Sequence, residues 1–306
     1  MTPLTVPSGE PAGHHSDGGD HRPSSNDAAR GATTVEVVLA PRDIPSHFTA
    51  WNRRWAPHGR RIPRVRGVRR ILRLGAERGW PTCLRHLGPF AFQPTNETRV
   101  FEFPWAFSQV RPTAGAVVVD VGGSLAGLQF AMAAAGAHVT NVDPGLAATG
   151  RGWAVEKQRH AQLCRAFGAG VTLISETLQD AGLPTESVDT VVCVSTIEHI
   201  PATEVDLLAP EIYRVLKPGG RAVLTVDLFL DLAPFSDLTQ NQWGTNIDVW
   251  SFIIKSRLQL IVGEPSLLLG SPSFDPKKVL GLLPELFIGT GYPALAQCIV
   301  LEKVRQ

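Results

Sequence analysis

The chain has 306 residues, of which 43% are hydrophobic and 19% are charged, and its formal net charge is +1. This length holds one large α/β domain with an accessory segment, and so small a net charge indicates no class of partner. Four widely spaced cysteines exclude a paired zinc or redox motif, and no apolar run reaches the length of a membrane span, so we expect a cytoplasmic protein without a membrane partner.

The N-terminal residues 1–45 are predicted to be a disordered tail. Gly, Pro, Ser, Asp and His dominate the first 33 residues, and so polar a stretch buries too little surface to offset its chain entropy. Val35 to Leu39 either forms a short strand or continues the tail.

Residues 46–110 are predicted to form a mostly helical, arginine-rich cover segment. A helix is expected from Arg66 to Arg78, with Val68, Ile71, Leu72 and Leu74 as its apolar set. The arginines suit a phosphate backbone, a solvated helix face, or docking on an acidic rim of the main domain. Aromatic residues crowd around Arg99 and Glu102, either as core or as a lid over a bound cofactor.

Residues 111–306 begin with the most informative stretch of the chain. The pattern reads strand, glycine turn, helix, strand and terminal acid, at Ala116 to Val119, Gly122 with Gly123, Ser124 to Ala135, His138 to Val142 and Asp143. Free helix N-terminal amides and a terminal acid are typical of a nucleotide-binding βαβ unit. We expect Asp143 to accept hydrogen bonds from two ribose hydroxyls.

The alternation of strands and helices continues to the C-terminus and predicts a doubly wound α/β sheet. Further strands are expected at 171–174, 188–195, 221–228, 258–262 and 296–303, with helices at 153–167, 204–216 and 247–255. Polar residues gather at the ends of five strands, where such sheets bind ligands: Asp120, Asp143, Glu176, Ser195, Glu198, His199 and Asp227.

Four motifs together make the chain resemble a class I S-adenosylmethionine-dependent methyltransferase. They are Val119 to Gly123, Val142 to Pro144, Asp189 to Ser195 before Glu198 and His199, and Leu216 to Gly220 before the fifth strand. The resemblance covers roughly residues 97–303. It implies a Rossmann-like seven-stranded methyltransferase sheet with helices on both faces.

The resemblance also implies where S-adenosylmethionine binds. Asp120 and the turn would hold the methionine part, Asp143 the ribose, and Glu176 the adenine amino group; the full implied set is Asp120, Gly122, Gly123, Ser124, Asp143, Pro144, Glu176, Thr177, Leu178 and Ser195. Ser124 and Ala126 replace two of the family's usual glycines but are still small. A nicotinamide cofactor is disfavoured by Asp120 and by the Leu216 to Gly220 turn.

His199 is the best candidate for a general base, because it titrates near neutrality and closely follows the fourth strand. Glu198 either orients His199 or bonds to backbone amides. Some relatives in this class hold magnesium with Glu-x-x-Glu-His at this loop. Here Ser195 replaces the first glutamate, so we expect no metal.

The sequence therefore predicts transfer of a methyl group to a small-molecule acceptor, with an O or N atom favoured over a C atom as the site of methylation. Two alternatives stay open: an RNA methyltransferase that uses the arginine-rich segment to bind nucleic acid, and a non-catalytic partner subunit that has kept the fold. The sequence does not define the oligomeric state.

Overall fold

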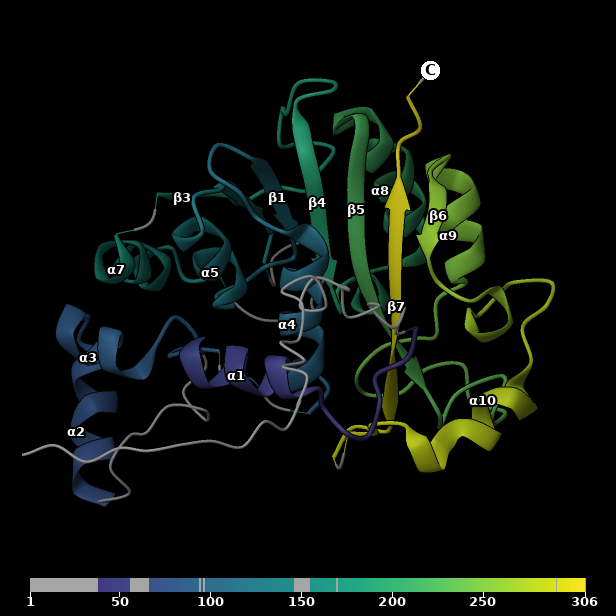
Figure 1. Ribbon diagram of the computed structural model, residues 1–306, viewed down its shortest axis with the longest axis horizontal. Helices are drawn as coiled ribbons and strands as arrows, with labels where there is room; N and C mark the ends of the chain where they lie inside the picture. Colours follow the sequence, from purple (N-terminus) through teal and green to yellow (C-terminus); the bar gives the residue numbers. More distant parts are fainter. Residues whose placement is uncertain are drawn as a thin grey trace, which may run out of the picture. The chain divides into compact units, whose positions relative to one another are not determined.

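A seven-stranded sheet forms the centre of the structure, with strand order β3-β2-β1-β4-β5-β7-β6 (Figure 1). The structure is a computed structural model that describes residues 38–55, 66–93, 95, 97–145, 155–168, 170–289 and 291–305. β7 runs antiparallel to β5 and β6, and the other neighbouring strands are parallel. The strands are β1 (Val117–Val121), β2 (His138–Val142), β3 (Val171–Ile174), β4 (Val188–Val194), β5 (Leu216–Phe229), β6 (Gln259–Val262) and β7 (Ala294–Glu302).

The central strands are buried on both faces because helices cover each side. Val118 packs into one hydrophobic core and its neighbour Val119 into another, as the alternation of side chains along a strand requires. Figure 1 shows α4 and α5 on one side of the sheet and α8 and α9 on the other. The expected seven-stranded sheet with helices on both faces is confirmed.

The helices of the described residues pack around this sheet, and α2, α7, α8 and α9 have bounds close to those expected. They are α1 (Ser46–Trp55), α2 (Arg66–Glu77), α3 (Pro81–Leu87), α4 (Arg99–Val110), α5 (Leu128–Ala134), α7 (Lys157–Phe167), α8 (Ala202–Val215), α9 (Val249–Ser256) and α10 (Pro276–Leu282). No helix within the described ranges is both long enough and apolar enough to cross a bilayer.

The described part of the predicted tail is packed against the main domain. The amide of Cys298 in β7 donates to the carbonyl of Val38 at 2.8 Å, and Leu39 forms a bridge with Gln297. Ala40 is fully buried. Residues 38–41 therefore pack on the domain, with Val38 and Leu39 beside β7 and Ala40 and Pro41 beside Phe287 and Leu286. These packed residues differ from the tail predicted for residues 1–45, of which residues 1–37 lie outside the described residues.

Two further expectations differ from the structure for local backbone reasons. The helix expected from Ser124 begins only at Leu128, because Ser124 has a φ of 44° in the left-handed region, which no helix residue adopts. The motif from Leu216 to Gly220, expected as a turn, belongs to β5. Its pairing with β4 shifts register there, where Gly219 has a φ of 81°.

Lys303 provides a test of how the last strand is attached. Its side chain is buried, and its ammonium donates to the carbonyls of Tyr213 at 3.1 Å and Leu216 at 2.9 Å and pairs with Glu186 at 3.0 Å. Lys303→Met removes three charge-assisted hydrogen bonds, so we expect the free energy of unfolding to fall by about 2–4 kcal/mol in urea titrations.

The matched control is Lys277→Met, because the Lys277 side chain is exposed. We expect it to change the free energy of unfolding by no more than about 0.5 kcal/mol. Equal effects of the two substitutions would contradict an anchoring role for Lys303.

Candidate functional site

The site lies at the carboxyl ends of the central parallel strands. Asp120 lies near the end of β1, Asp143 follows β2, Ser195 follows β4, and Asp227 lies near the end of β5. Asp120 pairs in register with Asn141 of β2 and with Val192 of β4, which brings these strand ends to one edge of the sheet. This is the edge at which open α/β sheets bind ligands.

The turn after β1 tolerates only very small residues. Gly122 has a φ of 71°, and a Cβ atom there would lie 2.3 Å from Cγ2 of Thr196. A Cβ atom on Gly123 would lie 2.6 Å from Oδ2 of Asp120. Both glycines therefore let the backbone pass close to strand-end side chains, which leaves room beside the turn.

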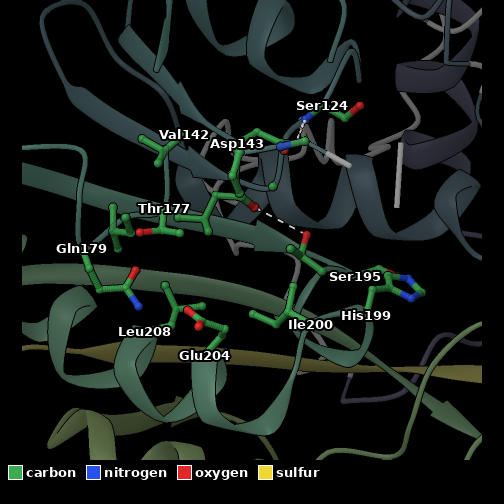
Figure 2. A pocket seen from close by; sticks show the side chains of 16 residues that line it. Ser124, Val142, Asp143, Thr177, Gln179, Ser195, His199, Ile200, Glu204 and Leu208 are labelled. Atoms are coloured by element: carbon green, nitrogen blue, oxygen red, sulfur yellow. Dashed lines mark hydrogen bonds between the residues drawn. The ribbon is translucent and has the colours of Figure 1, made fainter. Parts of the chain in front are cut away.

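Asp143 closes the turn through its carboxylate. Its Oδ2 accepts a hydrogen bond from the amide of Ser124 at 2.8 Å, and its Oδ1 accepts one from the amide of Gly145 at 2.7 Å. Burial raises the pKa of Asp143, although these two hydrogen bonds oppose the rise. Figure 2 shows the carboxylate beside Ser124 at the rim of a cavity. Each carboxylate oxygen still has a lone pair for another donor.

The larger of two neighbouring cavities has a volume of about 190 Å³ and opens beside Asp143 (Figure 2). Its walls come from the turn after β1, the end of β2, the loop after β3, and the loop and helix after β4. They include Val121, Gly122, Ser124, Val142, Asp143, Pro144, Thr177, Leu178, Gln179, Ser195, His199, Ile200, Glu204 and Leu208. The lining combines apolar side chains with two carboxylates, Asp143 and Glu204, and such a combination is common in ligand sites.

The smaller cavity has a volume of about 50 Å³ and is lined in part by the glycine turn, at Gly122 and Gly123. Gly122, Ser195 and His199 line both cavities, so the two adjoin. Its remaining walls include Asp120 and, from the N-terminal segment, Gln93, Arg99 and Phe103. The segment predicted to cover the site therefore contributes side chains to it.

Asp120 brings an incompletely paired acid to the smaller cavity. The residue is 2% exposed, and its Oδ2 has no hydrogen-bond partner among the described residues. Burial, assisted by the charge of Asp143, raises the pKa of Asp120 to about 8. A buried carboxyl group of this kind is neutral below that pH, and a cation placed beside it would favour its ionised form.

A second buried cluster lies behind Ser195. The Ser195 Oγ lies 2.5 Å from Oε1 of Glu198, is also hydrogen-bonded to Oδ2 of Asp227, and accepts a hydrogen bond from Arg99. A hydroxyl has one proton and two acceptor positions. Arg99 uses one acceptor position and one carboxylate takes the proton, so the other carboxyl group must itself carry a proton and donate it. One of the two acids is therefore neutral.

Glu198 is the acid that keeps the proton. Burial, together with the charge of Asp227, raises the pKa of Glu198 well above its usual range. Burial alone would raise the pKa of Asp227 as well, but the guanidinium of Arg99, 3.6 Å away, and hydrogen bonds that include one from Tyr292 lower it. Arg99 also pairs with buried Glu102, whose pKa is raised by burial.

His199 lies where the two cavities meet, and its hydrogen bond defines its tautomer. Its Nδ1 lies 2.6 Å from the carbonyl oxygen of Trp243. A carbonyl oxygen only accepts, so Nδ1 carries the proton and the neutral ring has its lone pair on Nε2. Nε2 lies 3.9 Å from Oε1 of Glu198.

Glu198, His199 and Asp227 also form the one group of potential metal ligands found among the described residues. One ligand atom from each lies within 4.8 Å of the others. Asp227 is already paired with Arg99, and Glu198 holds a proton that a metal would have to displace. The absence of a metal stays a prediction.

The structure brings together most, but not all, of the predicted site residues. Gly122, Ser124, Asp143, Pro144, Thr177, Leu178, Ser195 and His199 line the larger cavity, and Asp120 and Gly123 line the smaller one. Glu176 is exposed and lines neither, because the chain turns inward only at Thr177 and Leu178. Glu198 is buried and reaches neither cavity.

Sequence reasoning did not assign Arg99, Gln93 or Tyr292 to the site. The available signal for Arg99 was an Arg-x-x-Glu pair inside an aromatic run, because an arginine surrounded by apolar residues needs a buried partner. Tyr292 follows the last helix and reaches Asp227 only through the antiparallel return of β7, which local pattern does not reveal.

Comparison with known proteins gives a family match inside this domain. Residues 119–224 match the family described as Methyltransferase domain. Over 110 residues the chain is 38% identical to the ubiquinone/menaquinone biosynthesis C-methyltransferase UbiE of Rubrivivax gelatinosus. That alignment covers 36% of this chain and 39% of the relative, so the chain matches less than half of the relative's length.

Two solved structures are similar at low sequence identity. Geranyl diphosphate C-methyltransferase from Streptomyces coelicolor A3(2) is 14% identical with a TM-score of 0.44, over 67% of this chain and 77% of that chain. An S-adenosylmethionine-dependent methyltransferase from Mesorhizobium loti is 16% identical with a TM-score of 0.43, over 66% of this chain and 97% of that chain. Similarities of this size carry no conclusion about substrate.

The raised pKa of Asp120 gives a prediction about stability. Its folded-state pKa of about 8 lies above the ordinary 3.8, so the folded protein loses stability as pH rises between these values. Asp120→Asn removes that loss. We therefore expect the variant and the wild type to be equally stable near pH 4, and the variant to be more stable by roughly 2–5 kcal/mol near pH 9.

Urea unfolding of the ligand-free proteins across this pH range measures the difference. Asp206→Asn is a suitable control, because Asp206 is an exposed acid on α8. A difference between Asp120→Asn and the wild type that does not change with pH would show that Asp120 is ionised throughout.

Proposed function

We propose that this chain, whose residues 119–224 match the family described as Methyltransferase domain, is an S-adenosylmethionine-dependent methyltransferase that transfers a methyl group to an O or N atom of a small-molecule acceptor. When bound, S-adenosylmethionine supplies an electrophilic methyl group on a sulfonium ion. The proposal rests on one observation: two cavities of different chemistry adjoin at Gly122, Ser195 and His199. A cofactor with a nucleoside end and an amino-acid end fits this arrangement.

The larger cavity suits the adenosine end of the cofactor. The carboxylate oxygens of Asp143 can each accept a further hydrogen bond from a ribose hydroxyl, and the glycine turn beside it allows a ligand to approach the backbone closely. Thr177, Leu178 and Gln179 form the wall at which an adenine ring would pack. Because Glu176 is exposed, we assign adenine contacts to these residues and not to Glu176.

The smaller cavity suits the methionine end, which carries an ammonium and a carboxylate. Asp120 offers a buried carboxyl oxygen that lacks a partner among the described residues, and Arg99 offers a guanidinium in the same cavity. One acid and one base in a cavity of about 50 Å³ complement an amino-acid zwitterion. The ammonium would also stabilise the ionised form of Asp120.

His199 is positioned to take a proton from the acceptor. Its Nδ1–H is held by the carbonyl of Trp243, so Nε2 is the basic atom of the neutral ring. A hydroxyl or ammonium acceptor becomes a nucleophile only after losing a proton, and a nearby imidazole can accept it. Alignment of that nucleophile with the methyl group supplies much of the remaining acceleration.

Glu198 acts through other residues and not on the acceptor itself. Its Oε1 accepts a hydrogen bond from the amide of Asp227 at 3.2 Å and contacts Ser195, and it lines neither cavity. It therefore fixes the Ser195 hydroxyl and the loop that carries His199. We assign it a positioning role.

Asp143→Ala tests the ribose assignment. Loss of both carboxylate oxygens should weaken binding of S-adenosylhomocysteine by at least about 100-fold in calorimetry. Asp206→Ala, which removes an exposed acid on α8, should leave affinity unchanged. Circular dichroism confirms that both variants are folded. Affinity like that of the wild type in folded Asp143→Ala would rule out the assignment.

His199→Ala tests the assigned base. We expect turnover to fall by about 10²–10⁴-fold while cofactor affinity stays within about threefold, because the ring acts on the acceptor proton. Added imidazole should restore part of the rate, and His86→Ala on the exposed face of α3 should behave like the wild type. An unchanged rate would remove His199 as base, and a parallel loss of affinity would indicate a structural role.

Formation of S-adenosylhomocysteine from S-adenosylmethionine distinguishes the candidate functions. Turnover with hydroxyl- or amine-bearing small molecules supports the proposal. Turnover only with RNA would favour the alternative function suggested by the arginine-rich segment. Cofactor binding without turnover on either substrate class would favour a non-catalytic subunit.

A further inference from the structure

Helix α2 leaves a line of apolar side chains exposed to solvent. Val68, Ile71 and Leu74 are 38%, 64% and 43% exposed, and they recur at every third position along the helix. On the inner side, Gly75 and Ala76 are buried, and a Cβ on Gly75 would meet Sγ of Cys83 in α3 at 2.4 Å. Contact with α3 therefore covers only part of the apolar surface of α2.

Beside these apolar side chains, α2 carries three exposed arginines. Arg69, Arg70 and Arg73 are all exposed. Helical periodicity places Arg69 and Arg73 on the side of the helix opposite Ile71, and Arg70 one turn before Leu74 at the border with the apolar residues. Glu77 at the end of the helix is its one acid. The arginines thus attract anions, and burial of the neighbouring apolar side chains away from water is energetically favourable.

A tryptophan extends this surface beyond the helix. Trp80 is 51% exposed, and the guanidinium of Arg78 lies 5.9 Å from its ring centroid. Figure 1 shows α2 and α3 next to each other and away from the strand ends that form the two cavities. We call Val68, Ile71, Leu74 and Trp80, with Arg69, Arg70, Arg73 and Arg78, the α2 surface.

We propose that the α2 surface docks on anionic phospholipid bilayers. A helix with an apolar flank and an arginine flank lies in the plane of a membrane interface, with its apolar side chains at the acyl boundary and its cations at the lipid phosphates. An arginine side chain can lie with its aliphatic part on apolar surface and its guanidinium at the lipid head groups, and tryptophan is enriched at the same membrane–water interface. A bilayer as the partner differs from the expectation in Sequence analysis that the protein has no membrane partner.

RNA fits this surface less well, although both partners offer phosphates. Bases stack on aromatic rings, and the phosphate backbone pairs with cations, but neither covers aliphatic side chains. Ile71 is as exposed as any large apolar residue in the described chain, and a bilayer would bury it. The exposed aliphatic flank therefore favours lipid.

Vesicle co-sedimentation of the full chain tests the proposal. At low salt, the protein should sediment with vesicles of phosphatidylcholine and phosphatidylglycerol in equal parts, and remain in the supernatant with phosphatidylcholine alone. Arg69→Gln/Arg70→Gln/Arg73→Gln should lower the partition coefficient on the order of 100-fold. Ile71→Gln/Leu74→Gln should lower it by at least about tenfold.

Two control variants carry equivalent changes at other places. Ile254→Gln alters a residue of α9 that is also 64% exposed, and Lys157→Gln/Arg165→Gln/Lys277→Gln removes the same number of exposed charges. Both should sediment like the wild type. None of the substituted residues lines either cavity, so cofactor binding should be unaffected in all these variants and the result does not depend on the proposed methyl transfer.

Three results would overturn the proposal. The wild type would not sediment with anionic vesicles, or Ile71→Gln/Leu74→Gln would sediment as well as the wild type, or the protein would bind a single-stranded RNA through the same arginines while ignoring vesicles. The last result would assign the α2 surface to nucleic acid.

Discussion

The arrangement of the site depends on two carboxyl groups buried at the ends of neighbouring strands. Asp143 is held by two backbone amides, whereas Asp120 keeps one oxygen without a partner among the described residues and has a pKa raised to about 8. Burial, assisted by the charge of Asp143, disfavours the ionised form of Asp120, so most of the ligand-free protein keeps Asp120 neutral at physiological pH. A ligand that brings a cation to this point favours the ionised form.

The N-terminal segment supplies the only guanidinium that the described residues place in the smaller cavity. Arg99 lies in the first turn of α4 and is held by Glu102, Ser195 and Asp227, so its position is tied to the strand ends of the core domain. Glu198 keeps a proton so that three acids and one arginine can share this buried space. The segment is therefore part of the site's electrostatics.

Local sequence pattern was sufficient for the sheet and for the acids at its strand ends. Runs such as Val188 to Val194 are buried on both faces and can be predicted from the sequence alone, and residues 119–224, which include them, match a methyltransferase domain family. Local sequence pattern did not predict features that depend on an unusual backbone conformation or on contacts between distant parts of the chain. Ser124 adopts a left-handed φ that delays α5, and Tyr292 reaches Asp227 only because β7 returns antiparallel beside β5.

The central claim is that the cofactor's ammonium pairs with Asp120 and drives off its proton. Calorimetric titration of S-adenosylhomocysteine in two buffers of different ionisation enthalpy counts the protons released, at a pH roughly 1.5 units below the Asp120 pKa of about 8. The account predicts release of about one proton from the wild type and about none from Asp120→Asn. Equal release from both proteins would contradict it.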